Sequence, residues 1–406
     1  MGKHRAWAEI DLDAFGHNLS QIAERAGRGV EVILVVKADG YGHGALPLAQ
    51  EAQRLGHGSF GVGTAAEALE LRQGGLFGRI LLLGTIVDDE AEPALRHGIE
   101  LGLHSSDRCQ KLSQLATRLG LVARVHLNVD TGMGRLGVLP QRALDLLREI
   151  AAAPGLELAG LMSHVAAPSG AREAGAHEQA RLFSAVVAQA RERGLLRGIT
   201  HLCNSASLFT DLGPGWDAVR PGIAAYGMLP EELLVGGIEL LPVLALRAQV
   251  IFFKDLEAGT PVGYGGTWTA HRRSRIATLP IGYNDGVPWR LGNRGRVLVR
   301  GRSVPIVGRV SMDYITMDVT DVPGVEVGDV ATLIGRDGDE RIRAEDLARV
   351  ADTIPYEITC SIGRRVPREV VRGGSLFKVA ERGPDRVAAA PAVLTPAPGV
   401  AGSGGR

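Results

Sequence analysis

The chain has 406 residues, of which 45% are hydrophobic, and this length favours two domains over one. Its 45 Lys and Arg balance its 45 Asp and Glu, so nothing in the charge calls for nucleic acid or an anionic membrane as a partner. Three scattered cysteines (Cys109, Cys203 and Cys360) are too few for a disulfide framework or a zinc site, and no metal is expected. Because no apolar run reaches the length of a signal peptide core or a membrane helix, we expect a cytoplasmic protein.

The first half of the chain alternates helical and strand-like patterns. Leu12, Phe15, Leu19 and Ile22 recur at helical spacing, and Gly27 offers a stop, which predicts an opening helix. Eight short apolar runs follow, separated for the most part by helical patterns. The runs are residues 32–36, 60–62, 80–83, 101–103, 123–129, 158–162, 199–203 and 218–220. Eight parallel strands that alternate with helices close a barrel.

The pattern changes after about residue 238. Strand-like runs at 243–253, 274–281, 296–299, 306–310, 315–319 and 329–334 are separated by Gly, Pro and Asp turns. The predicted fold class is therefore α/β, with an N-terminal eight-stranded parallel (β/α)8 barrel at 1–238 and a C-terminal mostly β domain at 239–378. The first ten or so residues are candidates to pair with the second domain. Residues 379–406 are rich in Ala, Pro and Gly and are predicted to be a disordered tail.

Lys37 lies where the first predicted barrel strand ends and a glycine-rich turn begins. A lone lysine at a strand end is most often only solvated, but this end of a barrel carries the catalytic residues, and an amine there can bond to an aldehyde cofactor. Tyr41 follows in the turn, where its hydroxyl can contact a cofactor phosphate. The loops after the seventh and eighth strands, a common phosphate site in barrels, contain Asn204-Ser205 and Gly222-Ile223.

Several motifs of the chain resemble the alanine racemase family. VVKADGYGHG at 35–44 is similar to the lysine signature of that family, which uses pyridoxal phosphate (PLP). Later blocks match in the same order, and they are NVDTGMGRLG at 128–137, RPGIAAYG at 220–227, GYGGTW at 263–268, IGYNDG at 281–286, GRVSMD at 308–313 and PYEI at 355–358. The resemblance covers roughly residues 5–378 and implies a PLP-dependent racemase that supplies D-alanine for peptidoglycan.

The resemblance also assigns roles to individual residues. Lys37 and Tyr264 are implied as the two bases that act on opposite faces of the substrate Cα. Arg135 and the backbone N–H of Met312 are implied to bind the substrate carboxylate. The residues implied in cofactor binding are Lys37, Tyr41, Arg135, His164, Asn204, Ser205, Arg220, Gly222, Ile223 and Tyr356. Positions that match the lining of the family's substrate entrance are Tyr283, Arg290, Arg309 and Ile354.

Arg220 is implied to face the pyridine nitrogen of PLP, with His164 expected to hold it in place. A guanidinium stays protonated and donates, so the ring nitrogen remains unprotonated and the cofactor is a weaker electron sink, which suits a racemase. A tyrosine needs nearby positive charge to act as a base at neutral pH, and His164, Arg220 or Arg309 are candidates to supply it for Tyr264. The family further implies a head-to-tail homodimer with shared active sites.

Three alternatives remain beside alanine racemisation. A racemase of another amino acid, such as serine, lysine or several, is excluded by no feature of the sequence. A non-catalytic PLP-binding barrel would lack the second domain that contains Tyr264, Met312 and Tyr356. A barrel-type PLP decarboxylase needs an acidic group at the pyridine nitrogen, whereas this chain has Arg220.

Asn128 departs from the family pattern. Many relatives have a carbamylated lysine at this position, and its negative charge orients the arginine that matches Arg135. Asn128 is uncharged, and an unpaired buried guanidinium is costly. We therefore expect a small anion, chloride, beside Asn128 and Arg135, with a water or a rearranged side chain as the equal alternative.

Overall fold

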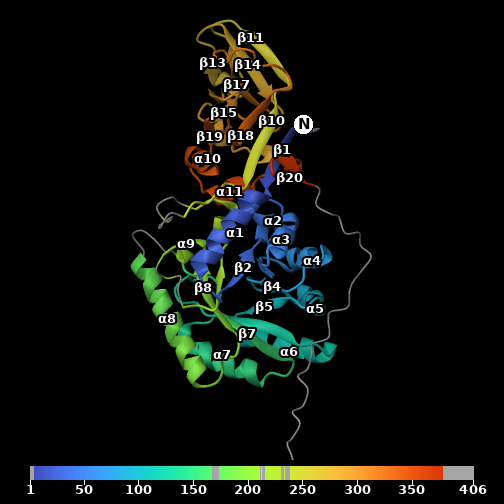
Figure 1. The fold of residues 1–406 in the computed structure, drawn as a ribbon, viewed down its shortest axis with the longest axis vertical. Coiled ribbons are helices and arrows are strands. Elements are labelled where there is room, and N and C mark those ends of the chain that lie inside the picture. The colour runs from blue at the N-terminus through green and yellow to red at the C-terminus, as the bar shows by residue number, and fades with distance from the viewer. Residues whose placement is uncertain are drawn as a thin grey trace, which may run out of the picture.

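The computed structural model describes residues 4–166, 173–210, 212, 215–229, 233 and 238–377. Figure 1 shows a barrel in the lower half and a strand-rich part above it. No helix within these ranges is long and apolar enough to cross a membrane. The predicted tail at 379–406 lies outside the described residues.

Eight parallel strands close the barrel in chain order, which confirms the predicted fold class. They are β2 (Glu31–Val35), β3 (Ser59–Val62), β4 (Arg79–Leu82), β5 (Glu100–Leu103), β6 (Ala123–Asn128), β7 (Leu156–Met162), β8 (Ile199–Asn204) and β9 (Ala218–Arg220). The first strand pairs with both the second and the last, which closes the ring. All eight coincide with predicted strands because each contains a short apolar run that is largely buried.

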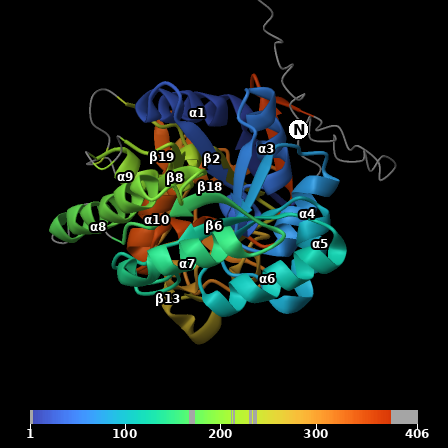
Figure 2. The same cartoon turned by 90° about the horizontal axis from the view of Figure 1, so that it is seen from below.

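Helices surround these strands in the view along the barrel (Figure 2). The helices of this half are α1 (Leu12–Ala26), α2 (Lys37–Tyr41), α3 (Ala45–Arg54), α4 (Ala65–Gln73), α5 (Asp88–Arg96), α6 (Ser106–Leu119), α7 (Pro140–Ala152), α8 (Glu173–Glu192) and α9 (Ser205–Leu208). The first helix shows how the sequence sets the bounds. The Asp11 side chain accepts from the N–H groups of Asp13 and Ala14, the predicted apolar face is buried, and Gly27 ends the helix with a φ of 92°.

The second half is built from sheets. The largest has the order β16-β15-β18-β10-β1-β20-β21, with β19 paired to β18. Its strands are β1 (Ala6–Asp11), β10 (Leu244–Gln249), β15 (Arg296–Val299), β16 (Arg302–Pro305), β18 (Val330–Asp337), β19 (Glu340–Ile342), β20 (Arg368–Arg372) and β21 (Ser375–Leu376). The N-terminal strand lies between β10 and β20, so the start of the chain is part of the C-terminal sheet.

Two smaller sheets complete this half. One contains β11 (Phe252–Leu256), β14 (Ser274–Leu279) and β17 (Ile315–Asp318), and the other contains β12 (Pro261–Val262) and β13 (Trp268–Thr269). Two helices, α10 (Ala344–Ala351) and α11 (Pro355–Cys360), lie towards the barrel in Figure 1.

Two strand predictions in this half were wrong. The run at 243–253 is two strands, β10 and β11, which belong to different sheets because the chain leaves the first sheet after Gln249. The run at 306–310 is not a strand and makes only an isolated bridge between Ile306 and Met317. Gly308 interrupts it with a φ of 74°, a left-handed conformation that a strand cannot contain. The segment just before this run, β16, is the strand that forms a hairpin with β15.

Candidate active site

A cavity of about 330 Å³ opens at the carboxyl end of the barrel strands. Parallel barrels present their functional loops at this end, so its position matches that of a barrel active site. All ten residues that the sequence resemblance assigns to cofactor binding line this one cavity. They are Lys37, Tyr41, Arg135, His164, Asn204, Ser205, Arg220, Gly222, Ile223 and Tyr356.

Lys37 is positioned by an unusual turn. The residues after it, Ala38, Asp39 and Tyr41, have φ values of 52°, 52° and 55°, a left-handed conformation that costs a non-glycine residue roughly 1–2 kcal/mol. The Ala38 N–H donates to Glu67 Oε1 at 2.7 Å and fixes the start of the turn. The pKa of the Lys37 amine is lowered, first because the surrounding protein desolvates it and then because the positive charge of Arg135 opposes its own. A neutral amine is the form that forms a bond or accepts a proton.

The opposite part of the cavity contains uncharged donors. Ser205 Oγ accepts from the N–H groups of Gly222 at 2.8 Å and Ala224 at 3.2 Å, so its own hydroxyl hydrogen is left to donate. A Cβ at Gly222 would lie 2.5 Å from the Tyr41 hydroxyl, so glycine is needed for this close approach. Burial raises the pKa of Tyr41, which keeps its hydroxyl protonated and able to donate. The Gly222 N–H is bonded to Ser205.

The second half of the molecule contributes Tyr356 to the cavity. Its ring centroid lies 5.9 Å from that of Tyr41, and it belongs to α11. A Cβ at Gly42 would overlap the carbonyl of Thr359, and Arg368 Nε donates to the Gly42 carbonyl at 3.0 Å. This close approach holds the helix against the barrel and explains how a residue so distant in sequence reaches the site.

Arg220 is buried, and its main side-chain contact is one that the sequence analysis missed. Its Nη1 lies 2.6 Å from His201 Nδ1, whereas its Nη2 lies 3.5 Å from His164 Nδ1. His201, on β8, therefore holds Arg220 more closely than the expected His164. Burial lowers the pKa of His164 to about 3, with the charges of Arg220, Arg135 and Lys37 acting in the same direction. His164 is consequently neutral at physiological pH and cannot supply the positive charge that was considered for Tyr264.

Asn128 and Arg135 both line the cavity, but no hydrogen bond joins their side chains within the described part of the chain. The chloride prediction assumes that Arg135 is buried, but Arg135 is exposed in the single chain. Its burial would therefore require a second subunit.

Tyr264 and Met312 do not line the cavity. Tyr264 is 74% exposed in a short turn between β12 and β13, which Figure 1 shows at the end of the molecule away from the barrel. Met312 is 52% exposed, and no acceptor among the residues described by the structure takes its backbone N–H.

Several other residues of the C-terminal half make contacts with one another. The Arg309 guanidinium lies 4.8 Å from the centre of the Trp289 ring, and the Asn284 N–H donates to the Met312 carbonyl. Arg290 pairs with Asp352 at 3.0 Å, and Tyr283 and Ile354 are 45% and 59% exposed. The predicted entrance residues thus lie in the C-terminal half, where Tyr283 and Ile354 are exposed.

Barrel, cavity and second domain together define a two-domain barrel enzyme. The family model for the alanine racemase N-terminal domain matches residues 10–230, and the one for the C-terminal domain matches residues 243–370. The chain belongs to the alanine racemase family.

Individual proteins agree with this membership. The chain is 40% identical to the alanine racemase of Halothermothrix orenii over 89% of its own length and 96% of that protein. Its structure is similar to that of alanine racemase from Clostridium difficile 630, with a TM-score of 0.88, 31% identity and coverage of 93% and 98% of the two chains. A structure of the Bartonella henselae enzyme, described with covalently bound pyridoxal phosphate, gives a TM-score of 0.80 at 31% identity and covers 90% and 99%.

Proposed function

We propose that this protein is a PLP-dependent racemase that interconverts L- and D-alanine, and that its product serves peptidoglycan synthesis. The observation that carries the proposal is the convergence of the ten residues implied in cofactor binding on one cavity at the carboxyl end of the barrel. The relatives named alanine racemase, and the similar structure described with pyridoxal phosphate, support the same substrate and cofactor.

The cavity residues fit this cofactor. The free hydroxyl hydrogen of Ser205 and the protonated hydroxyl of Tyr41 are two donors that would hold a phosphate. The Lys37 amine, with its lowered pKa, would hold the aldehyde carbon, and Arg220 would donate to the ring nitrogen. When bound, pyridoxal phosphate supplies electron withdrawal from the substrate Cα.

The protein's own residues then move the proton. Lys37 Nζ takes the Cα proton on one face or returns it there, and Tyr264 Oη does the same on the opposite face. The backbone N–H of Met312 and the Arg135 guanidinium bind the substrate carboxylate and hold Cα between the two bases.

A homodimer would complete the site. Tyr264 and Met312 are exposed and lie outside the cavity of their own chain. Exposed aromatic and apolar side chains in one region are typical of a protein interface. We propose that Tyr264 of the partner subunit reaches the cavity of Lys37 in a head-to-tail dimer.

The substrate is tested with a panel of single-enantiomer amino acids incubated with the holoenzyme. We expect alanine to racemise fastest and to reach equal amounts of the L- and D-enantiomers at equilibrium, as measured by chiral chromatography. Faster racemisation of serine or lysine would replace alanine as the substrate, and the absence of exchange at any Cα would refute the racemase itself.

Activity is expected to depend on halide at constant ionic strength. We propose that chloride lies between Asn128 and Arg135, because Asn128 supplies no charge and the partner subunit would bury the Arg135 guanidinium. Exchange of chloride for a larger non-coordinating anion should lower the rate, carbon dioxide should have no effect, and Asn128→Lys should abolish the halide dependence. Electron density that shows only protein and water between the two side chains would contradict this site.

A further inference from the structure

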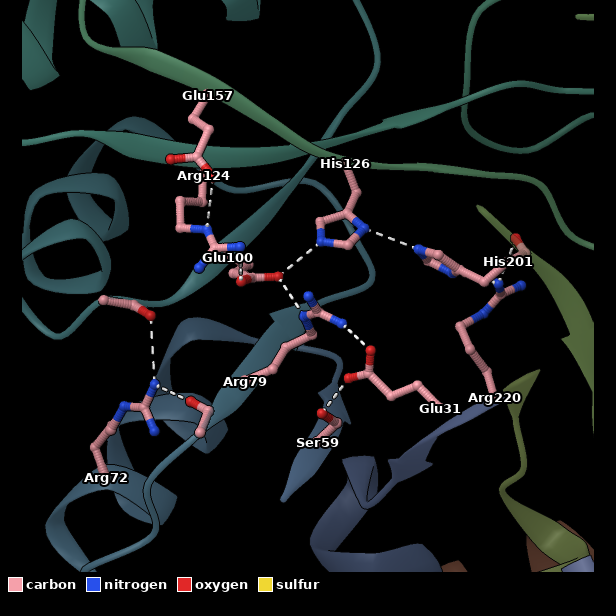
Figure 3. A network of polar contacts seen from close by, with 12 residues as sticks. Glu31, Ser59, Arg72, Arg79, Glu100, Arg124, His126, Glu157, His201 and Arg220 are labelled. Carbon is pink, nitrogen blue, oxygen red and sulfur yellow. Dashed lines mark hydrogen bonds and ion pairs between the residues drawn. The ribbon is translucent and has the colours of Figure 1, made fainter. Parts of the chain in front are cut away.

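A chain of polar side chains crosses the inside of the barrel and ends on Arg220 (Figure 3). Arg220 Nη1 lies 2.6 Å from His201 Nδ1, and His201 Nε2 lies 2.8 Å from His126 Nδ1. His126 Nε2 lies 2.7 Å from Glu100 Oε2, which also accepts from Arg79 Nε at 2.8 Å. Five barrel strands, β4, β5, β6, β8 and β9, each contribute one residue. Arg79 also pairs with Glu31, so the chain of contacts begins at the amino end of the strands and ends at the active-site end.

The chemistry of the end groups fixes the direction of every hydrogen bond between them. A guanidinium only donates, so His201 Nδ1 must accept and its proton must be on Nε2. That proton is donated to His126 Nδ1, which leaves the His126 proton on Nε2, where it is donated to the Glu100 carboxylate. The three bonds therefore all point from Arg220 towards Glu100. Burial lowers the pKa of both histidines, which keeps them neutral as this pattern requires. Burial alone would raise the pKa of Glu100, but His126, Arg79 and Arg124 lower it overall, so the carboxylate is ionised.

This arrangement leaves Arg220 with one N–H for a ligand. Its Nη1 donates to His201 Nδ1 and to the His201 carbonyl at 2.8 Å. Its Nη2 donates to the carbonyls of Ser163 at 2.6 Å and Leu202 at 3.0 Å. The four terminal hydrogens are thus taken, and only the Nε–H remains for a ring acceptor in the cavity that Arg220 lines.

No carboxylate contacts Arg220 within the part of the chain that the structure describes. Burial lowers the pKa of its guanidinium to about 10. The negative charge that reaches it through hydrogen bonds is that of Glu100, two imidazoles away, and aligned hydrogen bonds polarise one another in a low-dielectric interior.

We propose that His201, His126 and Glu100 form a relay of positioning residues that holds Arg220 charged and aimed at the cofactor ring. This proposal depends on the proposed function in one respect only, which is the identity of the ring that accepts from Arg220. The contribution of the relay to the reaction is indirect, because none of its three members lines the cavity.

The barrel makes room for the relay at Gly160. A Cβ on this β7 residue would overlap His126 Nδ1, so the imidazole occupies the space of the missing side chain. Barrel interiors are more usually filled by branched apolar side chains, and here Ile33, Leu81 and Ala218 form only a small apolar cluster. Because apolar filling would stabilise a barrel without the risk of unsatisfied buried groups, stability alone does not account for the relay.

The protonation pattern tests the relay without any substitution. The full chain, labelled with ¹⁵N-histidine, is compared with and without pyridoxal phosphate in long-range ¹H–¹⁵N spectra at neutral pH. Replacement of each histidine in turn by Gln assigns the signals. We expect His126 and His201 to be neutral, with the proton on Nε2, in both samples. A charged imidazole, or a proton on Nδ1 of either residue, would overturn the relay. This readout is independent of turnover, so a chain that failed as a racemase would still show whether the two imidazoles have the tautomers that the relay requires.

Two variants test its contribution to Arg220. Glu100→Gln keeps the shape and the acceptor for His126 but removes the charge, and Gly160→Ala displaces His126 without removing a polar group. For both we expect kcat to fall about ten-fold, the KM for alanine to change little and the absorption maximum of the bound cofactor to shift. Arg124→Gln is the control, because it removes another ion pair of Glu100, at 3.3 Å, outside the relay. Folded variants with the wild-type spectrum and kcat would refute the relay. If both variants fail to fold, the tautomers of the unmodified protein decide.

Discussion

Lys37→Ala is expected to abolish racemisation, with a loss of about 1,000-fold or more in kcat in both directions. The reason is that one amine would have two tasks, to hold the cofactor and to move the Cα proton. Its lowered pKa and its position after β2, at the edge of the cavity, suit both. The rate is measured from D- and from L-alanine with chiral chromatography.

Chemical labelling identifies the same residue independently of rate. The chain has five lysines, which are Lys3, Lys37, Lys111, Lys254 and Lys378. Borohydride reduction of the holoenzyme, followed by peptide mapping, should place the cofactor on Lys37 alone. Lys111→Ala is a matched control, because Lys111 pairs with Asp88 and Asp107 on the outer helices and should be replaced without loss. A label on any other lysine would end the assignment of Lys37.

The sequence predicted the barrel well because its strands contain short apolar runs between helices. A local pattern of this kind is sufficient to locate each strand. The C-terminal half was less predictable. Several of its strands pair across long sequence distances, which local pattern does not reveal. The run at 306–310 has the apolar pattern of a strand although Gly308 interrupts it. The ten cavity residues were found because each follows a strand end or belongs to a motif.

The relay residues were missed for a physical reason. Glu100, His126 and His201 lie within strands, and their partners are 26 and 75 residues away in sequence, so no local spacing links them. Each is a buried polar residue within a barrel strand, and a polar residue in a strand expected to be buried was the available signal. His164 was expected to hold Arg220, but the closer contact comes from His201 within the neighbouring strand.

Tyr264 and Met312 show a different limit. Their assignment rests on the family resemblance, and the single chain leaves both exposed and outside the cavity. If two subunits share the active site, as we propose, the geometry of one subunit does not reveal it. Experiments on mixed subunits therefore test which subunit contributes Tyr264 to each site.

Tyr264→Phe is expected to lower turnover by about 10²–10⁴-fold, the range of a lost general acid or base. The phenyl ring keeps the packing of the turn and removes only the hydroxyl. Each base serves one enantiomer, so exchange of the Cα hydrogen with deuterated solvent should persist better for the enantiomer that Lys37 deprotonates. Equal loss of exchange for both enantiomers would indicate that Tyr264 positions the substrate and does not carry the proton.

Mixed dimers then show which subunit supplies Tyr264. When Lys37→Ala and Tyr264→Phe chains are refolded together in equal amounts, half of the dimers contain one of each. If each site combines Lys37 of one subunit with Tyr264 of the partner subunit, one of the two sites in such a dimer is intact. The mixture should therefore recover roughly one quarter of the wild-type activity. The control pairs Lys37→Ala with the double variant Lys37→Ala/Tyr264→Phe and should recover none. If both residues act within one subunit, each chain of the first mixture still lacks one base, and it too should stay inactive.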